Sequence, residues 1–104
     1  AVMRVSISTC ERLHVYIPTA ANFIDCERRV TESIGGFTRW LAYGHWEGTE
    51  EWVQVYEIIG GDRTMSALAS EIGRQYLKDN PNEVECMCVV TDKQGTHRYS
   101  FFHN

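Results

Sequence analysis

The sequence predicts an α+β fold in which two helices cover one face of an antiparallel sheet. Two segments carry apolar residues at helical spacing, and four others have the two-residue alternation of strands. They follow one another in the order β-α-β-β-α-β, with one more strand at the end. This order is that of the split βαβ, or ferredoxin-like, sandwich. With 104 residues, we expect a single domain spanning residues 1–104.

The first half of the chain supplies a strand and a helix. The run Leu13–Ile17 is rich in strand-forming residues and ends at Pro18. The alternating segment Arg4–Ser8 either extends this strand or pairs with another element. Gly35 and Gly36 end the helix that follows. Its apolar positions are Phe23, Cys26, Val30 and Ile34.

Two central strands follow. We expect them at Phe37–Tyr43 and Trp52–Ile59, joined by a turn region over Gly44–Glu50. Both faces of the second strand are largely apolar, so both should be covered. The helices cover one face, and the simplest cover for the other is another subunit. A closed ring of three would bury each open face.

The second half repeats the helix–strand order. A turn at Gly60–Asp62 precedes a second helix, which either Asp62 or Thr64 caps. The buried stripe of this helix is Met65, Leu68, Ala69, Ile72 and Tyr76. A strand at Val84–Thr91, a tight turn and a last strand at Thr96–Phe102 complete the chain.

Composition excludes several classes of protein. The formal net charge is -4, whereas a nucleic-acid groove leaves a basic patch. The sequence has no apolar run of membrane length and no signal-peptide pattern. No pair of its four cysteines has C-x-x-C spacing, and Cys86 and Cys88 should share one strand face. We therefore expect a reduced, cytoplasmic protein without a metal site.

The stretch Gly35–Ile59 gathers aromatic and acidic residues near the end of a hairpin. Aromatic faces and carboxylates both attract positive charge, so this tip suits a small, flat, cationic ligand. The alternative is that the aromatic side chains only form core. No standard catalytic signature is present. The polar-tipped candidates in or beside the central strands are Tyr43, Trp46, Gln54, Tyr56 and Glu57.

Two of these candidates need partners. Gln54 interrupts an apolar strand, and its amide should hydrogen-bond a ligand, a neighbouring chain or backbone at an edge. Glu57 lies on the opposite face and would be costly to bury unpaired. An arginine such as Arg39 or Arg74 is the partner we expect if its role is structural.

Several segments together resemble the small phage-encoded enzymes that degrade S-adenosylmethionine. The resemblance covers residues 12–95 and is one of pattern more than identity. The fold of that family is similar to that of the trimeric PII signalling proteins, with ligand sites between adjacent subunits. The resembling segments are LHVYIP, CERRV, IGGFTRWLAYGHW, TEEWVQVYEI, ALASEIGRQYL and VECMCVVTD.

The resemblance implies a lyase. The carboxylate of S-adenosylmethionine would attack its own γ-carbon and expel the sulfonium group as 5′-methylthioadenosine, leaving L-homoserine lactone. No metal, cofactor or general base is required. The enzyme needs only to fold the substrate into attack geometry and to exclude water. In an infected cell such an activity would remove the methyl donor used by restriction-modification systems.

The resemblance also implies roles for individual residues. Tyr43 would line the ligand site. The family carries an important glutamate in the strand EEWVQVYEI, and Gln54 is the best match for it here. Either Glu50, Glu51 or Glu57 takes that role, or the chain is a glutamate-to-glutamine variant that binds substrate and turns it over slowly. We assign catalysis to Gln54 and Tyr43, and substrate binding to Trp46, Tyr56, Glu57 and Glu51.

Three other functions compete with this prediction. One is a PII-like module that binds an adenine nucleotide without chemistry. A second is a phage inhibitor that binds a host protein. A third is RNA binding by the sheet, which the acidic balance of the chain disfavours.

Overall fold

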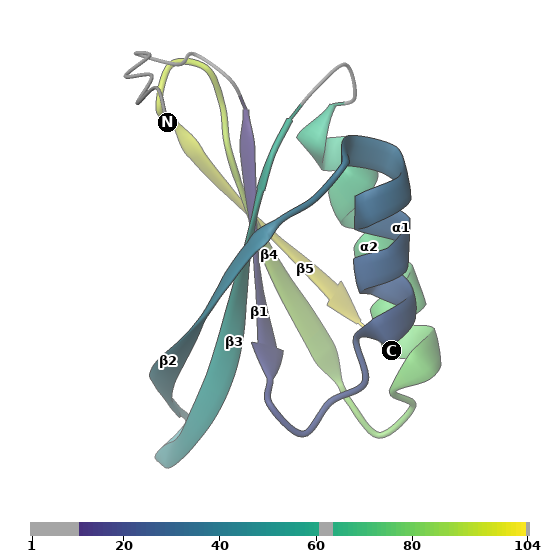
Figure 1. Ribbon diagram of the computed structural model, residues 1–104. Helices are drawn as coiled ribbons and strands as arrows, with labels where there is room; N and C mark the ends of the chain where they lie inside the picture. The colour runs from purple at the N-terminus through teal and green to yellow at the C-terminus, as the bar shows by residue number, and fades with distance from the viewer. Residues whose placement is uncertain (1–10, 61–63, 104) are drawn as a thin grey trace, which may run out of the picture.

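The computed structural model describes residues 11–60 and 64–103. Within them the chain forms a five-stranded antiparallel sheet with two helices on one face (Figure 1). The strand order is β2-β3-β1-β4-β5, which is the ferredoxin-like order with β5 added beside β4. The predicted fold class is therefore confirmed. The elements are β1 (Arg12–Pro18), α1 (Ile24–Ile34), β2 (Thr38–Trp46), β3 (Thr49–Ile59), α2 (Met65–Asp79), β4 (Glu85–Thr91) and β5 (His97–His103).

Strand alternation divides the sheet into a covered and an open face. Val15 of β1 pairs with Tyr56 of β3 and with Cys88 of β4, and all three side chains are buried on the helix side. Helix α2 packs on β1, β4 and β5, and α1 packs beside it over β3. Among the described residues no helix covers the other face, which we call the open face (Figure 1). Its large apolar side chains are Tyr16, Trp40, Val55, Ile59, Met87, Val89, Tyr99 and Phe101.

Local signals at the helix ends act as the sequence indicates. Gly35 ends α1 in the left-handed region at φ 105°, and its N–H donates to the Thr31 carbonyl over 2.9 Å. The Thr64 hydroxyl accepts from the Ala67 N–H at the start of α2, over 3.4 Å. Asp62, the other predicted cap, lies outside the described residues, as do the Arg4–Ser8 segment and Cys10.

Helix α2 approaches the sheet unusually closely at Gly73. A Cβ atom at this position would lie 2.6 Å from Cδ2 and 2.7 Å from Cγ of Phe102 on β5. Carbon atoms in contact normally lie about 3.5–4.0 Å apart. The missing side chain therefore lets α2 pack directly on the ring of Phe102.

The β2–β3 hairpin is longer and tighter than predicted. Its turn consists of Glu47 and Gly48 alone, both with positive φ (48° and 78°), and Trp46 pairs with Thr49. Positive φ at both central positions matches the twist of a two-residue hairpin. The predicted turn region over Gly44–Glu50 is wrong, because most of its residues continue the ladder.

The hairpin extends beyond the part of the sheet that the helices cover (Figure 1). Trp40, Tyr43 and Trp52 expose 43%, 55% and 54% of their surface, so in the described chain they are not plain core. No helix of the described residues is long and apolar enough to cross a membrane.

Candidate functional site at the hairpin end of the sheet

A cleft of about 540 Å³ opens where the hairpin tip, the end of β1 and the start of β4 meet. Strand pairing brings these segments together, because Tyr16 of β1 lies between Val55 of β3 and Met87 of β4. The loop before β4 closes one side. We call this space the acidic cleft and define it by Tyr16, Glu47, Glu51, Glu83, Glu85 and Met87.

The acidic cleft has the electrostatic character expected for a cation site. Four of its defining side chains are carboxylates, and its lining among the described residues includes no lysine or arginine. A cleft lined by one sign of charge concentrates ligands of the opposite sign. Tyr16, which is 37% exposed, adds an aromatic ring that can face a cation.

The other face of the hairpin carries the rings of Tyr43 and Trp52 with Leu41 beside them, and we call this surface the aromatic shelf. The rings of Tyr43 and Trp52 meet edge to face with centroids 4.9 Å apart. The Tyr43 hydroxyl donates to Glu50 Oε2 over 2.5 Å, and this bond raises the pKa of Tyr43. Tyr43 therefore remains a neutral phenol and presents its ring rather than a base.

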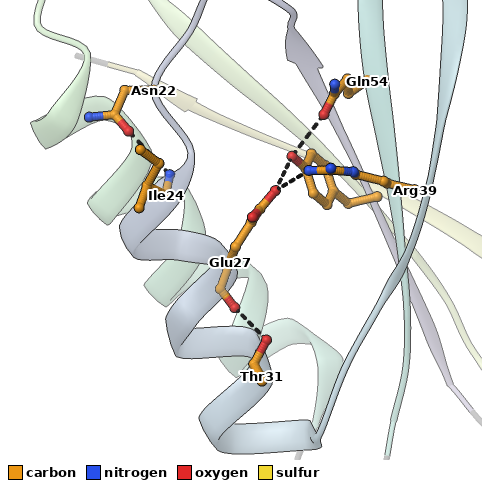
Figure 2. A network of polar contacts seen from close by, with 7 residues as sticks. Asn22, Ile24, Glu27, Thr31, Arg39 and Gln54 are labelled. Atoms are coloured by element: carbon orange, nitrogen blue, oxygen red, sulfur yellow. Dashed lines mark hydrogen bonds and ion pairs between the residues drawn. The ribbon is translucent and has the colours of Figure 1, made fainter.

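At the inner end of the shelf, polar side chains from three elements meet (Figure 2). Glu27 of α1 accepts from the Tyr56 hydroxyl over 2.6 Å and from Arg39 of β2 over 2.8 Å. The Tyr56 hydroxyl oxygen also lies 3.0 Å from Oε1 of Gln54. We call these four residues the Glu27 network.

Tyr56 is nearly inaccessible within this network. Its side chain is 3% exposed, and its ring lies 4.4 Å from that of Phe23 and 5.3 Å from that of Phe37, centroid to centroid. Burial raises the pKa of Tyr56 to about 12, with the bond to Glu27 acting in the same direction. A ligand can thus reach Gln54 more readily than Tyr56.

Glu57 is paired on the open face, but not with an arginine. His14 Nε2 lies 2.9 Å from Glu57 Oε2, and the imidazole and the Trp40 ring form a T-shaped pair with centroids 6.2 Å apart. The expectation of Arg39 is wrong because the guanidinium points to the covered face, where Glu27 binds it. Arg74 lies on α2, over that same covered face, whereas Glu57 lies on the open one.

The structure brings together only part of the predicted site. Gln54 and Tyr56 share the Glu27 network, Tyr43 lies on the shelf, and Glu51 lines the cleft. Glu57 is six residues from Glu51 along β3, or about 20 Å. The Trp46 side chain lies outside what the structure describes.

Sequence reasoning missed four residues of this region: Tyr16, Glu27, Glu83 and Glu85. The acids around NPNEVE were a visible signal, but nothing in the sequence placed them beside the hairpin. In the described ranges, His, Cys, Asp and Glu side chains form no group of three that could hold a metal ion.

Comparison with known proteins places this geometry in a known fold. No protein-family description and no curated protein matches the sequence. A phage SAM lyase in its apo state matches with a TM-score of 0.74 over 99% of this chain and 97% of that chain, at 8% identity. A phage SAM lyase in complex with S-methyl-5′-thioadenosine matches with a TM-score of 0.63 over 100% and 97%, at 9% identity. The chain shares the phage SAM lyase fold. The predicted resemblance is thereby confirmed at the level of architecture.

Proposed function

We propose that this protein is an S-adenosylmethionine lyase that forms 5′-methylthioadenosine and L-homoserine lactone. The observation that carries the proposal is the whole-chain match to phage SAM lyase, one of whose structures holds S-methyl-5′-thioadenosine. The acidic cleft and the aromatic shelf at one end of the sheet support it, since both suit a cationic, partly planar ligand.

The reaction requires little acid–base catalysis by the protein. A carboxylate oxygen of the substrate attacks the γ-carbon, the carbon–sulfur bond breaks, and its electron pair neutralises the sulfonium sulfur. The carboxylate and sulfonium charges vanish together, so a site drier than water favours the transition state. Holding the methionine part of the substrate in a folded conformer supplies the rest of the acceleration.

The described residues divide these tasks. Glu51 and its neighbours in the acidic cleft lie on the opposite face of the hairpin from the shelf, and their charge draws the cation to this end of the sheet. Tyr43 gives an aromatic wall near the sulfonium, and Gln54 holds the substrate by its amide. Tyr56 fixes Gln54 rather than touching substrate.

Two predicted binding residues remain part of this proposal. Trp46, at the hairpin tip, is proposed as a second aromatic wall. Glu57 lies too far along β3 from Glu51 to serve the same cleft. It could reach a bound substrate only from a neighbouring subunit.

We propose a homotrimer with sites between subunits. The open face exposes 43% of Trp40, 52% of Ile59, 61% of Tyr99 and 46% of Phe101, which is a large apolar surface for one chain. A ring of three covers these faces and leaves no open edge to the assembly. The biological role we propose is phage counter-defence in the cytoplasm of the infected cell.

Proton NMR of a mixture with S-adenosylmethionine tests the proposal, on this chain and on Gln54→Glu. Methylthioadenosine and lactone should appear together, before homoserine. Because the same cleavage occurs slowly in water, a protein-free sample at the same pH sets the baseline. Rates at that baseline in both proteins, with no binding by calorimetry, would overturn the lyase assignment.

The competing nucleotide-binding function is disfavoured by the acidic cleft, whose carboxylates repel a triphosphate. Calorimetry with ATP in place of S-adenosylmethionine separates the two. Tight ATP binding without S-adenosylmethionine binding would favour the nucleotide module.

A further inference from the structure

We infer that Glu27, acting through Tyr56, fixes which end of the Gln54 amide faces the ligand. Glu27 is thus a positioning residue. Its carboxylate turns the Gln54 NH₂ group toward Tyr56 and leaves the Gln54 carbonyl free to accept from a ligand N–H. The ligand part of this inference rests on the proposed function, whereas the orientation of the amide does not.

The Tyr56 hydroxyl has fewer hydrogens than acceptor positions within its reach. A phenol carries one hydrogen, yet two acceptor positions lie within reach of the hydroxyl: Glu27 Oε1 at 2.6 Å and Gln54 Oε1 at 3.0 Å. Hydrogen bonds to an ionised carboxylate are shorter and roughly twice as strong as those to a neutral acceptor. The hydrogen of Tyr56 therefore belongs to Glu27.

The Tyr56 oxygen then acts only as an acceptor toward Gln54. A carbonyl of Gln54 facing that oxygen would place two lone pairs against each other at 3.0 Å. The two ends of a carboxamide have nearly the same shape, so a half-turn exchanges them. With the NH₂ group toward Tyr56, the contact becomes a hydrogen bond.

The surroundings hold this order in place. The ring of Tyr56 is enclosed by Phe23 and Phe37, so the phenol has little freedom to turn toward another acceptor. Arg39 donates to the same oxygen of Glu27 over 2.8 Å, so that carboxylate oxygen receives both the guanidinium and the phenol.

The orientation of the Gln54 amide decides which hydrogen-bonding group the site offers to a ligand. The Gln54 carbonyl turns away from Tyr56 at the inner end of the aromatic shelf, where Leu41 pairs with Gln54 and is 57% exposed. An uncharged acceptor beside aromatic rings selects a ligand with N–H donors and disfavours a carboxylate or phosphate. In the proposed substrate, both the α-ammonium group and the adenine amine have this chemistry.

The first test reads the amide directly by ¹⁵N NMR. One NH₂ hydrogen of Gln54, assigned by its absence from Gln54→Glu, should exchange about fivefold more slowly than those of exposed Gln94. Glu27→Ala and Tyr56→Phe should each remove this protection. Glu32→Ala, an exposed site on the same helix, should keep it. Undiminished protection in Glu27→Ala would overturn the inference whether or not the protein is a lyase.

The second test measures binding of two unreactive probes, S-adenosylhomocysteine and methylthioadenosine. Glu27→Ala should weaken at least one probe about tenfold. Weakening of both assigns the Gln54 carbonyl to the adenine amine, and weakening of the first alone assigns it to the ammonium group. Unchanged affinity for both probes would overturn the ligand part.

A double-mutant cycle separates positioning from simple loss of a helix–sheet contact. In the Tyr56→Phe background no phenol hydrogen remains to direct, so adding Glu27→Ala should change probe affinity less than about twofold. Arg39→Ala, which breaks the same ion pair, should leave the amide protected. If Glu27→Ala keeps its full effect without the phenol, its role is only structural.

Discussion

Replacing Gly73 by alanine should destabilise the protein, although alanine is the better helix former. The added Cβ would lie 2.6–2.7 Å from the Phe102 ring, so the ring or strand β5 must move by about 1 Å to reach normal contact. Overpacking of this kind costs about 1–3 kcal/mol. The gain in helix propensity returns about 1 kcal/mol. We expect a net loss near 1 kcal/mol in the free energy of unfolding.

Urea unfolding followed by tryptophan fluorescence measures this loss, at one fixed protein concentration because association would shift the midpoint. Heating should show a decrease of about 4–8 °C in Tm. Gly36→Ala is the matched control, since nothing lies within 4 Å of its added Cβ. Adding Phe102→Leu should relieve the clash in Gly73→Ala. A Gly73→Ala protein as stable as the original would refute the packing argument.

Three further predictions concern the site, a helix end and a buried thiol. Glu51→Gln should weaken S-adenosylmethionine about threefold at low salt, by calorimetry, and leave uncharged methylthioadenosine unaffected. Gly35→Ala should cost about 1 kcal/mol in urea unfolding, because φ is 105° and no neighbouring atom intervenes. Burial raises the pKa of Cys26 from 9.0 to about 12, so above pH 9 the unfolded chain binds fewer protons than the native one. Stability should therefore fall as pH rises from 9 toward 12, and less steeply in Cys26→Ala.

Each of these has an outcome that contradicts it. Equal weakening of both ligands in Glu51→Gln would mean that the carboxylate acts by shape rather than charge. A Gly35→Ala protein with unchanged stability would show that α1 can end without the left-handed residue. Identical alkaline profiles for the original protein and Cys26→Ala would remove the thiol from the pH dependence.

The sequence predicted the elements well because local signals determine them. Gly35 and Thr64 act at the helix ends within a few residues of themselves. The alternation of β3 gave the correct faces, with Tyr56 toward the helices and Glu57 away from them. The apolar character of both faces of β3 predicted that another subunit covers the face that the helices leave open, and this stays a prediction.

Contacts between distant segments were not predictable in the same way. His14 meets Glu57 only because β1 pairs with β3 in one particular register. Glu85 reaches the cleft of Glu51 because β4 lies on the other side of β1. The hairpin turn was predicted too long because its glycine and acids are typical of loops, while the true turn is only two residues.

That two-residue turn also limits how the hairpin can vary in length. Glu50 and Glu51 are neighbours in sequence, yet one bonds Tyr43 on the shelf and the other lines the cleft. Inserting a single residue into β3 between the turn and these acids would exchange their faces. Two residues added to each strand, by contrast, would leave every side chain on its present face of the hairpin. In related proteins, the strands of this hairpin should therefore differ in length by an even number of residues, unless a β-bulge accommodates an odd one.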